Sequence, residues 1–175
     1  MTTDEDAEFT TLVQRQSRFV FRVAYAVLLN AHDAEDVVQE TFLKLYRNRG
    51  WQHLDNERAF LACVAWRIAV DRRSRSSQPT CPTLDTSAAD DRPSPDPSPE
   101  QTLLFSDQQA IVHSMIDTLP ETLRLPLVLS AFDELNSREI GGILGIPEGT
   151  VRTRLQHARQ LLHLKLNNIQ ETHYA

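Results

Sequence analysis

The residues with the clearest potential for chemistry lie between positions 148 and 166. Apolar side chains recur from Val151 to Leu162 at intervals of three and four residues, which predicts an amphipathic helix with one buried stripe. Arg152 and Gln156 lie on another face of this helix, near its start. In the DNA major groove, arginine can read guanine and glutamine can read adenine. The helix therefore suits the reading of duplex DNA, although an ordinary solvated face has the same pattern.

The stretch before this helix has the pattern of a second helix and a tight turn. Asn136, followed three residues later by Glu139, is an asparagine form of the capping box. Gly145 can adopt the left-handed conformation that ends a helix, and Pro147 favours the first turn of the next one. Two helices joined in this way form a helix-turn-helix, which favours the DNA-reading interpretation of the second helix.

A second basic cluster ends a helix predicted over 57–75. Its last residues, 71–75, read Asp-Arg-Arg-Ser-Arg, and it also contains Trp66 and Arg67, beside a loop with Trp51. Cations next to aromatic rings are what the binding of single-stranded DNA requires. The alternative is a basic last turn that complements the helix dipole, with both tryptophans in the core.

The helix predicted over 34–46 has a mixed acidic, amide and apolar face, with Asp33 as its expected N-cap. The residues of this face are Asp36, Gln39, Glu40 and Leu43. Such a surface suits docking onto a basic partner helix, because carboxylates pair with arginine or lysine around an apolar contact. A solvent-facing side of the helix is the alternative.

The sequence contains no motif of enzyme or metal chemistry. A glycine-rich phosphate loop, HExxH and GxSxG are all absent, and the six histidines are scattered. The two cysteines, Cys63 and Cys81, form neither a CxxC motif nor a short Cys/His cluster. We therefore expect no catalytic residue, no cofactor and no metal site.

Length and composition suit a soluble chain with one medium domain or two small ones. The 175 residues include 24 Asp+Glu, 18 Lys+Arg and only 5 Gly. No apolar run approaches the ~20 residues that span a bilayer, and the acidic start is unlike a secretory signal, so we expect a cytoplasmic protein without membrane insertion. The net charge of −6 conceals a basic N-terminal part, since residues 8–75 have 11 basic and 8 acidic side chains.

A proline-rich segment divides the chain. Six of the 9 prolines lie between Ser76 and Thr102, amid serine, threonine and aspartate, which is typical of a flexible acidic linker. Both flanking parts have helical spacing without strand-like alternation, so the expected fold class is all-α. Within the second part, Pro126 is expected to kink or restart a helix. The expected division is an acidic tail (1–7), a helical domain (8–75), the linker (76–104), a helix-turn-helix domain (105–167) and a C-terminal tail (168–175).

The chain resembles the extracytoplasmic-function (ECF) sigma factors of bacterial RNA polymerase. Residues 33–42 resemble region 2.2 of these factors, and residues 59–72 resemble regions 2.3 and 2.4. Leu119-Pro120 with Arg124, Glu139-Ile140 and residues 144–159 resemble region 4, in the same order along the chain. One departure is Gly141-Gly142, which replaces a usual Ala-polar pair and is expected to weaken its helix by ~1 kcal/mol per glycine.

The resemblance implies a two-domain initiation factor that binds core RNA polymerase and directs it to promoters. It implies contacts with the β′ clamp coiled coil and the β flap of the polymerase. The residues that match the polymerase-binding surface are Asp36, Gln39, Glu40 and Leu43. Family members are commonly held inactive by an anti-sigma factor, so the implied partners are core polymerase, promoter DNA and an anti-sigma factor.

The resemblance also implies two DNA-binding surfaces. Regions 2.3 and 2.4 open the proximal promoter element and capture a flipped base; the matching residues are Trp51, Asn56, Arg58, Trp66, Arg67, Asp71, Arg72 and Arg73. Region 4 reads the distal element; the matching residues are Arg152, Thr153, Gln156 and His157, with Arg138, Arg154 and Arg159 at phosphates.

Two other functions are compatible with the residues. An autonomous helix-turn-helix regulator would bind an operator without polymerase, and the purified protein alone would then bind a specific duplex. A helical interaction module would use its basic helix to bind an acidic protein, and removing nucleic acid would then change nothing.

Overall fold

The computed structural model describes residues 3–49, 51, 54–76, 102–131 and 135–173, and every regular element within these ranges is an α-helix. The expected all-α fold class is therefore confirmed. Of the linker expected over 76–104, residues 77–101 lie outside the described residues. The helices are α1 (Thr3–Leu28), α2 (Ala31–Asn48), α3 (Glu57–Ser76), α4 (Thr102–Asp117), α5 (Glu121–Ser130), α6 (Ser137–Leu144) and α7 (Glu148–His173).

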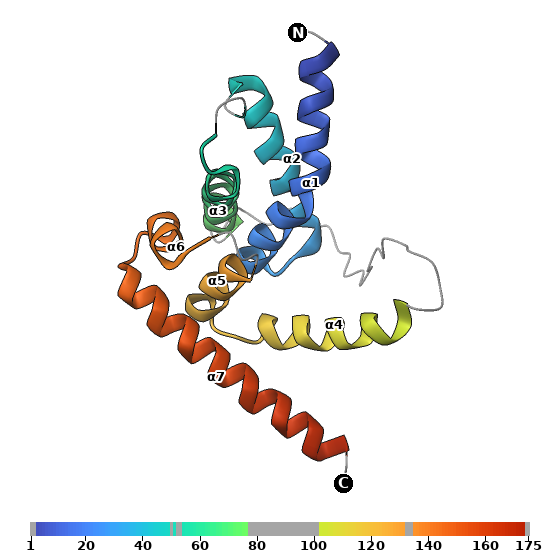
Figure 1. Cartoon of the computed structure of the whole chain (residues 1–175), viewed down its shortest axis with the longest axis vertical. Coiled ribbons are helices and arrows are strands. Elements are labelled where there is room, and N and C mark those ends of the chain that lie inside the picture. Colours follow the sequence, from blue (N-terminus) through green and yellow to red (C-terminus); the bar gives the residue numbers. More distant parts are fainter. Residues whose placement is uncertain (1–2, 50, 52–53, 77–101, 132–134, 174–175) are drawn as a thin grey trace.

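Helices α1, α2 and α3 pack into a first helical unit with an aliphatic centre (Figure 1). Val20 and Val23 of α1, Val37 of α2 and Leu61 of α3 are each at most 1% exposed. All four belong to the three- and four-residue spacing that predicts these helices. Burying each such side chain contributes about 1.5–3 kcal/mol, so the unit holds α2 and α3 firmly against α1.

The N-cap of α2 differs from the expectation. Asn30 has an extended backbone and its side chain accepts a hydrogen bond from the amide of Asp33 at 3.0 Å. Asp33 lies within the first turn, so its prediction as the N-cap is wrong. Asparagine and aspartate cap equally well, and the chain turns at Leu29, whose φ of 52° places Asn30 at the helix entrance.

Helices α1 and α7 both extend into segments expected to be tails. α1 begins at Thr3, within the expected tail 1–7, and α7 continues through the expected tail 168–175 as far as His173. Acidic side chains near the start of α1 favour helix formation because they lie at the positive end of the helix dipole. The end of α7 contains leucine, lysine, glutamine and glutamate, which are strong helix formers.

Helices α4 to α7 form a second helical unit. Leu129 of α5, Ile140 of α6 and Val151 of α7 are each at most 1% exposed and belong to its core. α5 is continuous through Pro126, whose ring is fully buried, so the helix does not restart there. The proline removes one backbone donor, but the burial of its ring offsets part of that loss.

The expected capping box and turn between α6 and α7 are both present. The Asn136 side chain accepts from the amides of Arg138 and Glu139 at 3.0 Å, and the Glu139 carboxylate accepts from the Asn136 amide at 2.8 Å. Gly145 ends α6 in the left-handed conformation, with φ 67° and ψ 33°. α7 then begins at Glu148, directly after Pro147. The helix-turn-helix predicted from the sequence is therefore formed.

The two glycines of α6 have different roles, and they predict opposite mutational effects. A Cβ on Gly141 would lie 2.6 Å from the carbonyl oxygen of Ile146, whereas a Cβ on Gly142 would have no atom within 4 Å. The expected weakening of the helix by glycine therefore applies to Gly142. Position 141 requires glycine, because the turn after α6 leaves no space for a Cβ there. Gly142→Ala should stabilise the protein by about 1 kcal/mol, and Gly141→Ala should destabilise it by about 1–3 kcal/mol. Urea unfolding of both variants tests this; shifts of the same sign would contradict it.

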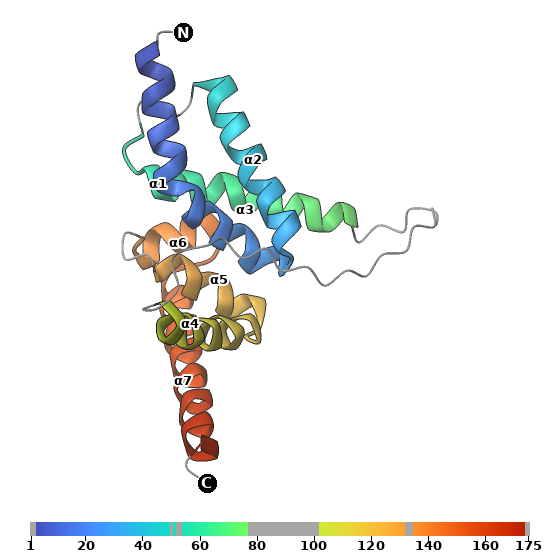
Figure 2. The ribbon, with the colours of Figure 1, turned by 90° about the vertical axis from the view of Figure 1, so that its right-hand side faces the viewer.

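The two helical units pack directly against each other. α5 contacts α1 and α6 contacts α3, and these pairs lie side by side in both views (Figure 1, Figure 2). The Arg124 side chain of α5 is 5% exposed, and its Nε donates to the carbonyl oxygen of Ala26 in α1 at 2.8 Å. Its Nη1 donates to the carbonyl oxygens of Leu119 and Asp117 at 2.8 and 3.1 Å. One buried guanidinium therefore joins the units.

Candidate nucleic-acid interface

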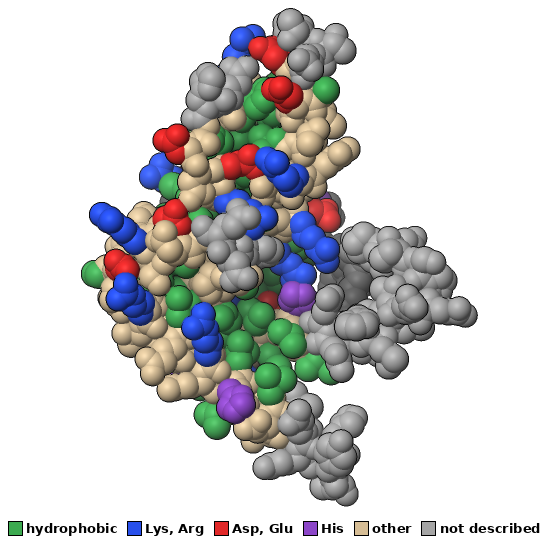
Figure 3. Space-filling view, viewed as in Figure 1, with side chains coloured by type: hydrophobic (Ala, Val, Ile, Leu, Met, Phe, Trp, Pro, Cys, Tyr) green, Lys and Arg blue, Asp and Glu red, His purple; other side chains and the backbone are tan. Residues whose placement is uncertain are grey.

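The start of α7 presents a row of exposed polar side chains. Val151, Leu155 and Ala158 are buried beneath it, at 0%, 7% and 0% exposure, which fixes the rotation of the helix. Figure 3 shows basic side chains over α6 and the start of α7. The exposed residues of the expected distal-element set are Arg138, Arg152, Thr153, Gln156, His157 and Arg159, while Arg154 is half-buried.

Arg152 is available for an intermolecular contact. Its side chain is 70% exposed and forms an ion pair with Glu148, one helical turn earlier. Because exposed pairs of this kind contribute less than about 1 kcal/mol, a guanine edge or a phosphate can replace the glutamate at little cost.

The expected proximal-element residues differ in their exposure. Arg67 and Asp71 are exposed on α3, whereas Trp51 and Trp66 are half-buried and pack on the core. The Trp51 ring lies 5.4 Å from the Phe9 ring, centroid to centroid. The sequence left two alternatives for the tryptophans, a stacking surface for single-stranded DNA or burial in the core. Each side chain combines the two, because it packs on the core and is still partly accessible.

Arg72 and Asp36, which the sequence assigns to different surfaces, pair with each other. Arg72 of α3 also forms an ion pair with Asp33, with 3.3 Å between Nε and Oδ1. This three-residue network links α3 to α2. It neutralises much of the Arg72 charge, so Arg72 is less available to DNA than Arg67.

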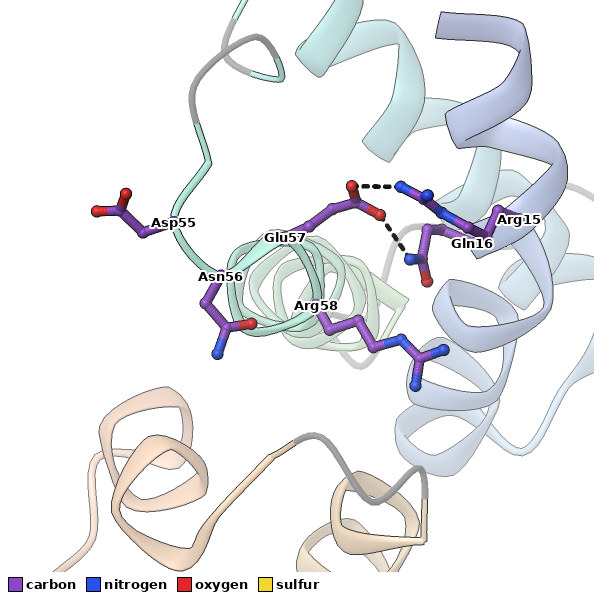
Figure 4. Close-up of a pocket in the computed structure, with 6 residues that line it drawn as sticks. All are labelled: Arg15, Gln16, Asp55, Asn56, Glu57 and Arg58. Atoms are coloured by element: carbon purple, nitrogen blue, oxygen red, sulfur yellow. Dashed lines mark hydrogen bonds and ion pairs between the residues drawn. The ribbon is translucent and has the colours of Figure 1, made fainter. Parts of the chain in front are cut away.

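A polar hollow lies at the start of α3, against α1 (Figure 4). Asn56 caps α3 by accepting from the Ala59 amide at 3.0 Å. The next residue, Glu57, accepts from Arg15 at 2.7 Å and from the buried Gln16 at 2.5 Å, and Figure 4 shows both partners reaching in from α1. Arg58 also lines the hollow.

Arg15, Gln16 and Glu57 were not among the residues singled out from the sequence. One signal was present for Gln16: it follows Leu12 by four residues, on the apolar stripe of α1, and a polar residue on such a stripe needs a partner. Its Nε2 finds that partner in Glu57, whereas its Oε1 is buried without a hydrogen-bond partner among the described residues.

The expected polymerase-binding face on α2 is largely exposed. Gln39 is exposed, Leu43 is 53% exposed, and Glu40 pairs with Lys44 at 2.9 Å. Gln39 and Leu43 also line an apolar hollow with three aromatic residues that the sequence assigned to no surface. These aromatic residues are Phe9, Phe42 and Tyr46.

Comparisons with known proteins agree on one family. Residues 12–78 match the Sigma-70 region 2 family, and residues 109–162 match the Sigma-70 region 4 family. The ECF RNA polymerase sigma factor SigW of Bacillus subtilis is 32% identical in an alignment that covers 95% of this chain and 92% of SigW. This chain belongs to the ECF sigma factors. Members of this family are DNA-binding transcription initiation factors.

Other proteins match this ECF sigma factor over most of its length. SigE of Mycolicibacterium smegmatis is 35% identical in an alignment that covers 86% of this chain but only 58% of SigE. The fold resembles the sigma factor RpoE of Bartonella quintana, solved with the anti-sigma factor NepR, with a TM-score of 0.63 and 19% identity over 95% of this chain and 98% of that one. It also resembles CnrH, solved with the cytosolic domain of CnrY, with a TM-score of 0.60 and 22% identity over 93% and 90%.

Among its described residues, the sigma factor has no helix long and apolar enough to cross a membrane. The domains that the two family models match correspond to the first and second helical units. The exposed row on α7 thus belongs to region 4, and the hollow beside Asn56 belongs to region 2.

A titratable cluster lies where the two units of the sigma factor meet. The Arg22 guanidinium of α1 lies 2.9 and 2.7 Å from the two ring nitrogens of His113 in α4. Burial and the nearby positive charge of Arg22 lower the pKa of His113 below its usual 6.5. Burial raises the pKa of Asp117, which faces the same cluster. Arg18 is a further cation near this histidine.

The lowered pKa of His113 predicts a loss of stability in acid. The unfolded chain binds a proton at His113 more readily than the folded one, so this contribution is complete above pH 6.5 and is lost as the pH falls towards the lowered pKa. His113→Asn keeps an acceptor for Arg22 but cannot titrate. Urea unfolding at pH 7.5 and 5.5 should show a smaller loss for the variant; equal losses would contradict this role of His113.

Proposed function

We propose that this sigma factor reads the distal promoter element with α7. One observation carries the proposal. The first half of α7 presents an exposed row from Arg152 to Arg159, and α7 follows a capped helix and a left-handed turn. Arg152 and Gln156 read base edges in the major groove, with Thr153 and His157 beside them. Arg138, Arg154 and Arg159 contact phosphates, which orient the helix without reading sequence.

The same proposal assigns the proximal element to α3 and to the loop before it. The hollow lined by Asn56, Arg58 and Gln16 is polar and lies at the start of α3, and polar side chains in such a hollow suit the edge of an unpaired base. Arg67, Arg73 and the accessible parts of Trp51 and Trp66 supply cations and stacking surfaces for the opened strand. Unstacking a base costs a few kcal/mol, and these contacts offset it.

Core polymerase binds the exposed face of α2 in this proposal. Gln39, Glu40 and Leu43 are accessible, and the apolar hollow beside them suits a projecting side chain of the β′ clamp coiled coil. Asp36 acts mainly through its pair with Arg72, because that pair fixes α2 against α3. The second unit docks on the β flap, so that polymerase holds both units on the promoter.

Weak DNA binding by the free protein follows from the number of contacts. Each unit has only a few basic side chains for phosphates, so its affinity should be low and sensitive to salt. Specific binding arises when polymerase fixes both units at the correct separation, which raises the effective concentration of the second contact.

An anti-sigma factor is a further proposed partner. Two solved proteins of similar fold are in complexes: the sigma factor RpoE with the anti-sigma factor NepR, and CnrH with the cytosolic domain of CnrY. We place the sigma factor in the cytoplasm, as a binding protein without catalytic activity of its own. This agrees with a family of initiation factors and with the lack of a membrane-spanning helix in the described residues.

Run-off transcription tests the proposed function. Core polymerase with and without this chain, on a library of host promoter fragments, should give promoter-specific transcripts only when the chain is present. Specific binding of one duplex by the chain alone, without any transcript, would favour an autonomous regulator instead. Unchanged association with a protein partner after nuclease treatment, again without transcripts, would favour a protein-interaction module.

The polymerase-binding face makes a separate prediction. Gln39→Ala combined with Glu40→Arg removes an amide and reverses a charge on α2, so affinity for core polymerase should fall by at least about tenfold. Gln14→Ala combined with Glu8→Arg applies the same substitutions to exposed positions of α1 and should bind normally. Fluorescence titration with core polymerase measures both; equal affinities for the two variants would remove α2 from the interface.

A further inference from the structure

A narrow cavity lies between the two helical units, beside the part of α3 that contains Trp66. Its volume is about 200 Å³, and residues of α3, α5, α6 and α7 line it. Pockets that hold drug-sized ligands are larger, at roughly 300–1,000 Å³. The cavity therefore has the size for one small ring with a short substituent, and the proposed function assigns no ligand to it.

The walls of this cavity are mainly apolar. Trp66 and Val70 line it from α3, Leu125 and Pro126 from α5, and Leu144 from α6. Pro126 is fully buried, whereas Trp66 and Val70 are half-buried. An aromatic ring placed beside another ring gains stabilisation beyond the burial of its area. A planar, apolar body therefore suits this space.

Three charged side chains also line the cavity, and one of them has no partner. Arg73 of α3 pairs with Glu121 of α5, so these two charges cancel. Arg154 of α7 is half-buried and forms no hydrogen bond or ion pair within the described part of the chain. The cavity thus has one unmatched positive charge. Partial burial reduces the hydration of this guanidinium, which favours pairing with an anion.

The single unmatched charge favours a carboxylate over a phosphate. A phosphate group has nearly two negative charges at pH 7 and three acceptor oxygens. Glu121 would repel the second charge, and the apolar walls would leave acceptors unpaired. A carboxylate has one charge, and a single guanidinium such as that of Arg154 can donate to both of its oxygens.

We propose that this cavity is a binding site for a small aromatic carboxylate. The ring packs against Trp66 and the apolar wall of α5, and the carboxylate accepts hydrogen bonds from Arg154. Benzoate has this size and both features. Trp66 and Arg154 also belong to the two surfaces proposed to bind the promoter, so a ligand here connects a small-molecule signal to promoter reading. That consequence rests on the proposed function, whereas the site itself does not.

Titration of the full chain with benzoate, without DNA or polymerase, tests the site. The chain has 2 tryptophans, so Trp51→Phe leaves Trp66 as the only one, and its fluorescence reports on the cavity. The fluorescence change should saturate, with half-saturation at about 0.1–10 mM for a ligand of this size. Benzamide, which has no charge, should bind at least about tenfold more weakly. Cyclohexanecarboxylate, which is not aromatic, should bind at least about threefold more weakly.

Four variants in the same background test the residues. Arg154→Gln removes the cation and should weaken benzoate binding at least about tenfold. Arg159→Gln removes a cation from an exposed position of the same helix and should bind benzoate like its parent. Val70→Phe fills the cavity and should abolish binding. Glu121→Gln removes the acidic charge and should strengthen binding about 2- to 10-fold.

A fluorescence change that does not saturate, or that neither Arg154→Gln nor Val70→Phe reduces, would overturn the site. Equal losses in Arg154→Gln and Arg159→Gln would also overturn it, because they would indicate general charge attraction. Benzamide or cyclohexanecarboxylate binding as tightly as benzoate would exclude an aromatic carboxylate as the ligand class. Since neither DNA nor polymerase is present, failure of the proposed promoter reading would leave these results unchanged, and failure of benzoate binding would leave the proposed function intact.

Discussion

Arg152→Glu is expected to reduce promoter-specific run-off transcription by at least about 100-fold. Loss of an arginine–base contact costs about 1–3 kcal/mol, and the new carboxylate adds repulsion from the phosphates. The new carboxylate would also lie one helical turn from Glu148, the residue that pairs with Arg152 in the parent protein. Because the side chain is 70% exposed, the fold should tolerate the change. The measurement is transcript yield with saturating sigma factor.

The controls for Arg152 separate DNA reading from polymerase binding. Arg152→Glu should bind core polymerase as tightly as the parent, because α2 is unchanged. Arg152→Lys keeps the charge but loses the two-pronged donor, so it should rescue only part of the activity. Full activity of Arg152→Glu would exclude α7 as the distal-element reader.

Arg124→Met is expected to lower the free energy of unfolding by about 3–5 kcal/mol. The guanidinium is 5% exposed and donates to three backbone carbonyl oxygens, in Ala26, Asp117 and Leu119. Methionine fills similar space but leaves these acceptors unpaired in a buried region. Ala26 lies in the last turn of α1, where carbonyls lack helical partners, so Arg124 also neutralises the negative end of that helix.

Urea unfolding of the full chain measures this effect, with Arg138→Met as the matched control. Arg138 is an exposed arginine of α6, so its loss should change stability by less than about 0.5 kcal/mol. If Arg124→Met cost no more than Arg138→Met, the buried guanidinium would not be what holds the units together. A broader transition for Arg124→Met is also expected, because the two units would then unfold more independently.

The local features of the second unit were predictable because they depend on residues close in sequence. The capping box needs only Asn136 and Glu139, and the left-handed turn needs only Gly145 before Pro147. The buried stripe of α7 follows from spacing alone. The same reasoning failed at Asp33, since two residues with equal capping propensity lay three positions apart and the turn at Leu29 chose Asn30.

The pairings between distant residues were not predictable from pattern. Spacing assigned Asp36 to one surface and Arg72 to another, and only the packing of α2 on α3 brings them together. Helix propensity also treated both glycines of α6 as costs, whereas the close approach of the Ile146 carbonyl makes one of them necessary. The residues of the site that were missed, Arg15, Gln16 and Glu57, meet across two helices.

The amino-acid sequence by itself determined the helices, the helix-turn-helix, the family and the polar face of α7. These properties arise from periodicity, caps and turn residues, whose energies act within a few positions along the chain. Only the tertiary structure decided which polar side chains pair with residues distant in the sequence. The packing of α5 on α1 and of α6 on α3 buries Arg124 and brings Glu121 and Glu139 to Arg73 and Asn56, because ion pairs and hydrogen bonds depend on distances in space.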